Sequence, residues 1–514
     1  MAAFNCQHHE EEEGDGSEGE GRGCSQATPC TTTNPCCRPH TKIQDAACAP
    51  LCMKCKQKAG QVLGNQTEPM CKDCLRLSLL SKFKTGLNHQ GAVGGSDKVL
   101  VAFSGGPGSR LALQFLCELQ SKLQDEAESC KDRNSAVFDV GVAFVDESGA
   151  QGIPLTDAQK TLDEIASVVA EVRPTPLPLH LTSLESLFEN EVLELQASSK
   201  LHEDDNSGKD NKDKSRQRLI ELLSRVEDQT GKEDLVEHMR MDALQRVAKH
   251  YGYTRVVLGL CTTRVAARVL AATAKGEGFA LPAGIQYVDA RWPVPVLLPL
   301  RDCVSKELSV LCHLTNLKTV FLKKMTAMGN SRASINSLTH SFISLINEEN
   351  PSREYTIMRT AAKLIPFGFN KLAQDDSMLH FNGRPRNPHA RRNLGRIEPC
   401  EIEVLCPICS APLAKSDFSS LQPKVSVSDS FTRMSLEEAF EPSTSGIDSE
   451  LLPSKIFRDV CCPSCQYQII PDQSKDSVLE LLPLMVQQRA AASLLRKEGW
   501  MREYIGDCLL ESDE

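Results

Sequence analysis

The sequence lacks any uninterrupted apolar run near the roughly 20 residues that a helix needs to cross a bilayer. Its first residues are acidic, whereas a secretory signal is basic and then apolar. Positive charge is not in excess either: the net charge is -10, so the chain as a whole has no general attraction for nucleic acids or anionic membranes. We therefore expect a cytoplasmic protein with no membrane partner, in which any contact with a nucleic acid uses a local patch.

Cysteine is too sparse for a disulfide scaffold but is arranged in pairs. The 514 residues include 22 cysteines, and four Cys-x-x-Cys pairs occur among them. In a reducing compartment such pairs indicate metal binding rather than disulfides. Fifteen residues separate the pair Cys52 and Cys55 from the pair Cys71 and Cys74. At this spacing two turns can present four thiolates to one tetrahedral ion, so we predict a zinc site.

A second set of cysteines predicts another zinc site, although a long serine-rich insertion separates its two pairs. The insertion is harmless if it loops out. The predicted ligands of the second set are Cys406, Cys409, Cys462 and Cys465. Cys400 and Cys461 lie nearby in the sequence and leave the choice of ligands open. The alternative for both sets is unrelated reduced pairs.

Strands alternate with helices through the middle of the chain. Each compact apolar run is followed by a segment with apolar residues at helical spacing. This alternation implies right-handed crossovers and an α/β fold, a parallel sheet with helices on both faces. The expected strands are residues 98–103, 138–146, 175–182, 254–260 and 293–300.

Changes in composition divide the chain. Segments that are charged or serine-rich and poor in apolar residues indicate disorder. The expected parts are a disordered leader (1–47), a four-cysteine module (48–90), an α/β domain (97–375) with a flexible insertion at about 198–216, a basic linker (376–399), a split four-cysteine module (400–470) with a disordered insertion (411–456), and a helical tail (474–514).

A glycine-rich loop follows the first expected strand and opens a helix. Its sequence, Ser-Gly-Gly-Pro-Gly-Ser, has the form of a pyrophosphatase loop, in which backbone N–H groups and serine hydroxyls surround a phosphate. It is not a Walker A loop, because no Gly-Lys-Ser/Thr follows. A Gly-Gly turn also occurs in many unrelated sheets, so the loop alone does not establish nucleotide binding. The candidate phosphate-binding residues are Ser104, Gly105, Gly106 and Ser109.

The order of these motifs resembles a known family. A four-cysteine knuckle, SGGxxS after a strand, GLCTTR after a later strand, PLR-x4-KEL and a second cysteine module resemble the two-subunit cytosolic thiouridylases of eukaryotes. The resemblance is greater to their second subunit, and the closing GDCLLESDE strengthens it. It implies an N-type ATP-pyrophosphatase fold, similar to adenine-nucleotide alpha-hydrolases, flanked by zinc-ribbon-like modules.

The resemblance also implies a reaction and partners. In this family, ATP adenylates the C2 oxygen of the wobble uridine in tRNAs for Lys, Glu and Gln. Sulfur from a thiocarboxylated ubiquitin-like carrier then displaces the adenylate and gives 2-thiouridine. The implied partners of this chain are therefore tRNA, the sulfur carrier and a homologous catalytic subunit, with which it would form a heterodimer.

Departures from the family pattern weaken the case for catalysis by this chain. Gly108 stands where active members have an aspartate, and Thr263 and Arg264 replace two acids that would help to hold magnesium. Glu233 and Val236 occupy the places of a Cys-x-x-Cys pair, which argues against an iron–sulfur cluster on this chain. The same departures argue against ATP binding.

One thiol remains near the presumed catalytic edge. Cys261 lies at the end of the fourth expected strand and is the candidate for a sulfur-carrying role. A small buried apolar side chain is the alternative interpretation, and it is favoured for a cysteine at a strand end.

A short basic segment predicts contact with RNA. Arginines can follow RNA phosphates and stack on exposed bases. A solvated linker without a ligand is the alternative. The candidate RNA-binding residues are Arg384, Arg386, Arg391, Arg392 and Arg396. Lys82 and Lys84, close to the first cysteine module, could extend this surface.

Three functions follow from the sequence. The first is a subunit of a tRNA sulfur-transfer complex with a largely structural nucleotide fold. The second is an independent ATP-dependent adenylating enzyme of the same fold, and the third is a zinc-ribbon scaffold unrelated to RNA. Purified single chain that releases pyrophosphate from ATP with its own substrate would favour the second function, and absence of tRNA from purified complexes would favour the third.

Overall fold

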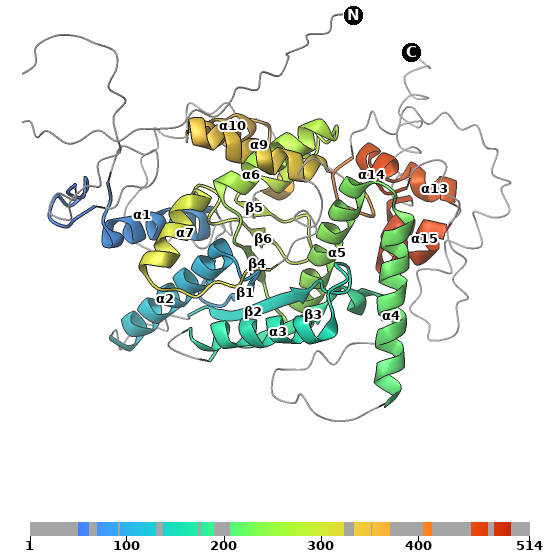
Figure 1. Cartoon of the computed structure of the whole chain (residues 1–514), viewed down its shortest axis with the longest axis horizontal. Coiled ribbons are helices and arrows are strands. Elements are labelled where there is room, and N and C mark those ends of the chain that lie inside the picture. The colour runs from blue at the N-terminus through green and yellow to red at the C-terminus, as the bar shows by residue number, and fades with distance from the viewer. Residues whose placement is uncertain are drawn as a thin grey trace, which may run out of the picture. The chain divides into compact units, whose positions relative to one another are not determined.

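A six-stranded sheet organises the chain in the computed structural model (Figure 1). The strands are β1 (Lys98–Ala102), β2 (Asp139–Asp146), β3 (Leu179–Ser183), β4 (Arg255–Leu258), β5 (Val288–Asp289) and β6 (Val296–Leu297). The structure describes residues 50–60, 69–90, 93–129, 137–172, 176–189, 206–322, 334–350, 352–370, 404–413, 454–470 and 477–494.

The strand order is β3-β2-β1-β4-β6-β5, and every neighbouring pair except the last is parallel. In register, Val99 of β1 lies opposite Val140 of β2 and Arg255 of β4. The prediction of a parallel sheet is correct for five strands and wrong for β5, which pairs antiparallel with β6. A two-residue strand is too short to give a periodic signal in the sequence.

Helices cover both faces of the sheet, as predicted. The helices are α1 (Lys72–Lys84), α2 (Pro107–Ser129), α3 (Leu155–Ala170), α4 (Asn206–Arg225), α5 (Gln229–His250), α6 (Thr262–Ala274), α7 (Ser305–Leu314), α9 (Ile335–Glu349), α10 (Arg353–Ala361), α13 (Ser454–Asp459), α14 (Pro463–Gln468) and α15 (Ser477–Leu481), and residues 484–494 are also helical. Shorter turns are η1 (Thr85–Gln90), η2 (Leu184–Phe188), η3 (Leu281–Gly284) and η4 (Gly368–Asn370).

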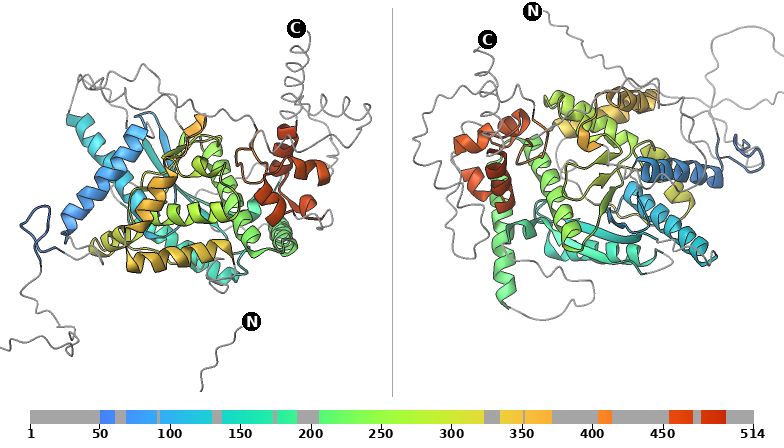
Figure 2. Two further views of the ribbon diagram at one scale, coloured as in Figure 1. Left: turned by 90° about the horizontal axis from the view of Figure 1, so that it is seen from above. Right: turned by 180° about the vertical axis from the view of Figure 1, so that it is seen from behind.

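Alternate strand residues enter two separate cores, because side chains of a strand point to opposite faces. Val99 and Val101 of β1 pack in one core with residues of α1, α2, α3 and α7. Leu100, between them, packs in the other core with residues of α4 and α5 and with the C-terminal cysteines. The views in Figures 1 and 2 agree that α4, α5, α14 and α15 lie together and that α1 and α2 lie elsewhere on the sheet.

Helix α4 begins inside the segment predicted to be a flexible insertion. Residues 206–216 of the predicted 198–216 are helical. The apolar side chains of Leu219 and Leu222 are fully buried in the core beside α5, and they anchor the helix. Burial of these later residues stabilises the polar turns before them, because helix formation is cooperative.

Local capping explains where other helices begin. Asp228 precedes α5, and its carboxylate accepts a hydrogen bond from the backbone N–H of Gly231 at 2.8 Å. Ser334 precedes α9 and accepts in the same way from Ser337 at 3.0 Å. Such caps satisfy backbone donors that have no partner within the helix.

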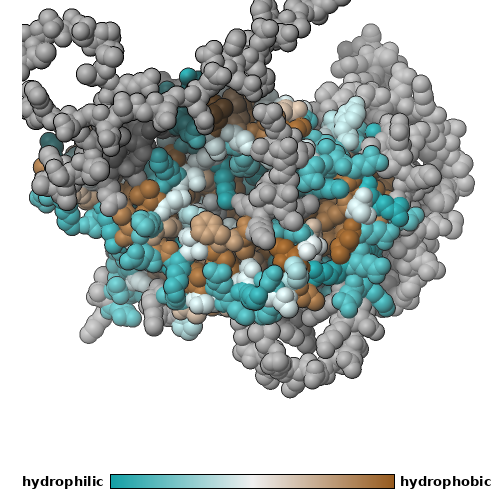
Figure 3. Space-filling model, in the orientation of Figure 1, coloured by the Kyte–Doolittle hydropathy of each residue, from teal (hydrophilic) through white to brown (hydrophobic). Residues whose placement is uncertain are grey.

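No helix in the described ranges is both long and apolar enough to span a bilayer. On the face in Figure 3, hydrophobic residues reach the surface at several separate places between hydrophilic ones. Scattered apolar residues of this kind are normal on folded proteins and do not require a partner. The predicted domain boundaries at 47, 90 and 375–400 fall at or beside residues outside the described ranges and stay predictions.

Candidate functional site

The N-terminal cysteines come together where a tight turn meets the start of α1. Lys56 N–H donates to the carbonyl of Cys52 at 2.8 Å and closes the turn, while Cys71 is the residue before α1. The Sγ atoms of Cys55 and Cys71 are 3.8 Å apart. All four Sγ atoms, those of Cys52, Cys55, Cys71 and Cys74, lie within 4.8 Å of one another.

The C-terminal cysteines also come together where a tight turn meets the start of a helix. Ser410 N–H donates to the carbonyl of Cys406 at 2.8 Å, and Cys462 is the residue before α14. Lys56 and Ser410, each four residues after the first cysteine of its turn, have φ values of 55° and 54°. The four Sγ atoms of this group also lie within 4.8 Å of one another, and they belong to Cys406, Cys409, Cys462 and Cys465.

These two groups have the geometry and chemistry to hold metal ions. Zn–S bonds of about 2.3 Å in a tetrahedron place sulfur atoms about 3.8 Å apart, which matches the distance from Cys55 to Cys71. Backbone hydrogen bonds from Cys55 and Cys71 lower the pKa of Cys52 to about 6. The side-chain hydrogen bond with Cys71 raises the pKa of Cys74 to about 12. A cation among the sulfurs would favour the thiolate at every position.

Cys461, which the sequence left as a possible ligand, is not one of the four cysteines of the second group. Cys461 is buried beside the group, but its S–H donates to the carbonyl of Phe457 at 3.4 Å. It is not among the four that converge. Cys400 lies outside the described ranges, as do Arg384, Arg386, Arg391, Arg392 and Arg396, so RNA contact by the basic linker stays a prediction.

The glycine-rich loop connects β1 to α2, and its polar groups are paired within the loop. Ser104 N–H donates to Ser109 Oγ, and Ser109 Oγ donates to the carbonyl of Gly106, both at 3.1 Å. Gly105 has a φ of +72° and accepts a hydrogen bond from Val320 N–H at 2.9 Å. The segment after α7 therefore lies directly against this loop, a contact that nothing in the local sequence predicts.

At the carboxyl end of the sheet, Gly108 at the start of α2 contacts Gly259 in the loop after β4. A Cβ atom at Gly108 would lie 2.2 Å from the carbonyl oxygen of Gly259, which follows β4. A Cβ atom at Gly259 would lie 2.3 Å from the N atom of Ser109. Both values are far below van der Waals contact. Gly108, where the family resemblance predicts an aspartate in active members, thus has no room for a side chain here.

The residues that follow β4 contact the apolar core and the segment that leads into α7. Cys261 is 3% exposed and lies in the apolar core with α2 and α7. Thr262 Oγ1 donates to the carbonyl of Arg301 at 2.7 Å, and Thr263 Oγ1 accepts from Ser305 N–H at 3.1 Å. Thr263, where the family resemblance predicts an acid in active members, therefore binds the start of α7.

Helix α5 carries Glu233 and Val236 where the family resemblance predicts cysteines in active members. Glu233 is buried and accepts a hydrogen bond from Ser334 Oγ at 2.8 Å, next to the start of α9. Arg240, on the same helix, makes an ion pair with Glu147, directly after β2. Both residues join elements of the fold, and sequence reasoning did not identify their partners.

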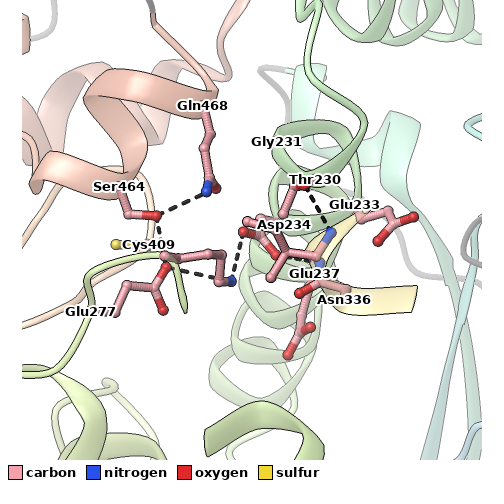
Figure 4. Close-up of polar contacts among 12 residues, drawn as sticks. Thr230, Gly231, Glu233, Asp234, Glu237, Glu277, Asn336, Cys409, Ser464 and Gln468 are labelled. Atoms are coloured by element: carbon pink, nitrogen blue, oxygen red, sulfur yellow. Dashed lines mark hydrogen bonds and ion pairs between the residues drawn. The ribbon is translucent and has the colours of Figure 1, made fainter. Parts of the chain in front are cut away.

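A polar network links α5 to the C-terminal cysteine group (Figure 4). Asp234 pairs with Lys275 at 2.8 Å, and Lys275 is 3.4 Å from Glu277. Glu277 accepts a hydrogen bond from Ser464 Oγ, which lies between two of the cysteines on α14, at 2.8 Å. A Cβ atom at Gly231 would lie 2.2 Å from the carbonyl oxygen of Gln468, so α14 packs directly on α5.

No protein-family model matches the chain. The Arabidopsis thaliana protein named cytoplasmic tRNA 2-thiolation protein 2 is 40% identical over 470 residues, which cover 90% of this chain and 92% of that protein. The chain belongs to the family of cytoplasmic tRNA 2-thiolation protein 2. The family resemblance predicted from the motifs is thereby confirmed.

More distant relatives carry the same name. The protein from Oryza sativa subsp. japonica is 34% identical and covers 90% of this chain and 89% of its own length. The human protein is 26% identical over 356 residues, 61% of this chain and 67% of its own length. A solved structure, the U34-tRNA thiolase NcsA from Methanococcus maripaludis with its 4Fe–4S cluster, is 17% identical, covers 61% of this chain and 87% of its own, and has a TM-score of 0.41.

Proposed function

We propose that the chain is a subunit of a cytoplasmic tRNA thiolation complex and is required for 2-thiolation of the wobble uridine in tRNAs for Lys, Glu and Gln. The observation that carries this proposal is the 40% identity, over nine-tenths of the chain, to a relative named for cytoplasmic tRNA 2-thiolation. Sulfur would come from a thiocarboxylated ubiquitin-like carrier, as in the family reaction.

Catalysis would belong to a homologous partner subunit. The close approach of Gly108 to Gly259 supports this assignment, because it leaves no space for the family's aspartate. Thr263 and Arg264 offer no carboxylate for magnesium, which prefers oxygen ligands of this kind. The loop that contains Ser104 and Ser109 would then serve as a structural turn in this chain.

The two cysteine groups would each hold one zinc ion. Four thiolates around a closed tetrahedral site are typical of structural zinc, which stabilises small modules. The sulfur geometry supports this assignment, because the four sulfur atoms of each group lie within 4.8 Å of one another. We therefore assign the metals a role in folding and docking rather than in sulfur transfer.

Depletion of the chain from cells is the test of the proposed function. We expect the amount of 2-thiolated wobble uridine in these three tRNAs to fall strongly or to zero, while the C5 side-chain modification stays. Mass spectrometry of tRNA nucleosides measures both, and re-expression of the wild-type chain is the control. Unchanged 2-thiouridine after complete depletion would rule the proposal out.

If catalysis belongs to the partner subunit, the same substitution in the two subunits should have unequal effects on the rate of tRNA thiolation. Ser104→Ala in this chain is expected to slow thiolation much less than the same change in the loop of the catalytic partner, because Ser104 bonds to Ser109 of its own loop and to no other side chain in the described part of the chain. The measurement is the initial rate of tRNA thiolation by the reconstituted complex. Equal losses from the two substitutions would mean that this chain contributes to a shared active site.

A further inference from the structure

The N-terminal cysteine group and α1 form a basic region in an acidic protein. The described residues 50–60 and 69–90 contain seven lysines and arginines and one acidic residue, Asp73, whereas the whole chain has a net charge of -10. Four thiolates and one divalent ion would together add two negative charges. The region would stay positive with its metal bound.

Some of these cations have structural partners. The paired residues are Lys58 with Asp73, Arg76 with Glu118, and Lys82 with Glu307. The remaining four make no ion pair within the part of the chain that the structure describes. These four residues, which we call the basic knuckle surface, are Lys54, Lys56, Lys72 and Lys84.

The cysteine turn holds the backbone that carries three of these lysines, and Lys84 is the last residue of α1. Lys54 and Lys56 are exposed on either side of Cys55, and Lys72 is exposed directly after Cys71. Backbone hydrogen bonds of 2.8 Å, from Lys56 N–H to Cys52 and from Cys52 N–H to Lys58, close the turn. In Figure 1 the turn lies at the outer end of α1, away from the strands.

The residue types point to a polyanion bound through its backbone. Lysine is a mobile point charge that suits phosphate oxygens. Phe83, on α1, is fully buried and cannot stack on a base. Binding by such a surface depends on phosphate spacing and salt, and not on base sequence.

We propose that the basic knuckle surface contacts the phosphate backbone of tRNA. This inference rests on the proposed function, which makes tRNA the substrate of the complex. It assigns a phosphate-binding role to the N-terminal cysteine group, in addition to any contact made by the arginines of the basic linker. The metal would act indirectly, because it fixes the turn that carries Lys54 and Lys56 and the start of α1 that carries Lys72.

The test replaces all four lysines of the surface by glutamine in the full-length chain. The matched control replaces four exposed lysines elsewhere, Lys160, Lys214, Lys249 and Lys363, and so removes the same charge. Fluorescence anisotropy measures the dissociation constant for unmodified tRNA at several salt concentrations. Each lost phosphate contact lowers the slope of log affinity against log salt by about one.

We expect the surface variant to bind several tRNAs about 10-fold to 100-fold more weakly at low salt, with a slope smaller by about three to four, while the control variant binds like the wild type. Metal content and circular dichroism should stay unchanged in both variants. Equal binding by the two variants, or a wild-type chain that does not bind tRNA, would overturn the inference.

The outcome is separable from that of the depletion experiment. If depletion removes 2-thiouridine but the surface variant keeps its affinity for tRNA, the proposed function stands and the surface is wrongly assigned. If the surface variant loses binding to the catalytic partner instead of tRNA, the lysines form a protein interface and the inference is wrong. If tRNA binding is lost but depletion leaves thiolation intact, only the proposed function fails.

Discussion

Replacing Cys406 by serine is expected to remove one metal ion per chain and to unfold the C-terminal cysteine group. Cys406 is 1% exposed and converges with three other thiols. A serine hydroxyl is a poor ligand for zinc at neutral pH, and binding of a structural zinc contributes on the order of 10 kcal/mol to folding. No other part of a small module can replace that contribution.

The effect should extend beyond the group itself, because its residues complete the core against α4 and α5. We expect the metal content to fall from two ions to one and the denaturant midpoint of unfolding to fall well below that of the wild type. Elemental analysis and equilibrium unfolding measure the two effects. Retention of two metals in Cys406→Ser would contradict the assignment.

Cys461→Ser provides the matched control. Cys461 adjoins the same group and is equally buried, yet its S–H donates to the carbonyl of Phe457. A serine hydroxyl can keep this hydrogen bond, so this variant should retain both metals and most of its stability. Loss of metal from the control variant would instead place Cys461 among the ligands.

The second large effect is expected from Gly108→Asp, the substitution that restores the family's carboxylate. It should destabilise the chain by about 1–3 kcal/mol or more and confer no activity on it. The new Cβ would lie 2.2 Å from the carbonyl oxygen of Gly259, so the backbone of one loop has to move. The added carboxylate would also lie close to that oxygen, and the two repel each other.

Gly106→Asp is the control, because it adds the same side chain two residues earlier, directly before α2. No atom lies within 4 Å of a Cβ at Gly106. An aspartate near the start of α2 interacts favourably with the helix dipole in both variants. The difference between their free energies of unfolding therefore reports the steric contact, and chemical denaturation measures this difference. Equal midpoints would show that the loops separate easily and that the site can admit a side chain.

Some features of the fold were predictable because they depend on local patterns. Valine-rich runs such as Lys98–Ala102 and Asp139–Asp146 form the expected strands, since β-branched side chains suit a buried sheet. The grouping of Cys52 with Cys74 also follows from local spacing, because a short connection limits where the second pair can lie. Other features depend on contacts between distant residues.

The amino-acid sequence alone determined the alternation of strands and helices, the two groups of cysteines and the family. These properties are carried by residue types at short, regular separations. The tertiary structure alone decided that Gly108 contacts Gly259, that Val320 contacts Gly105 and that Glu233 binds Ser334. Each of these contacts joins residues about a hundred or more positions apart, and their close approach depends on how the whole sheet packs. For that reason only the folded chain shows that Gly108, beside the glycine-rich loop, has no space for a side chain.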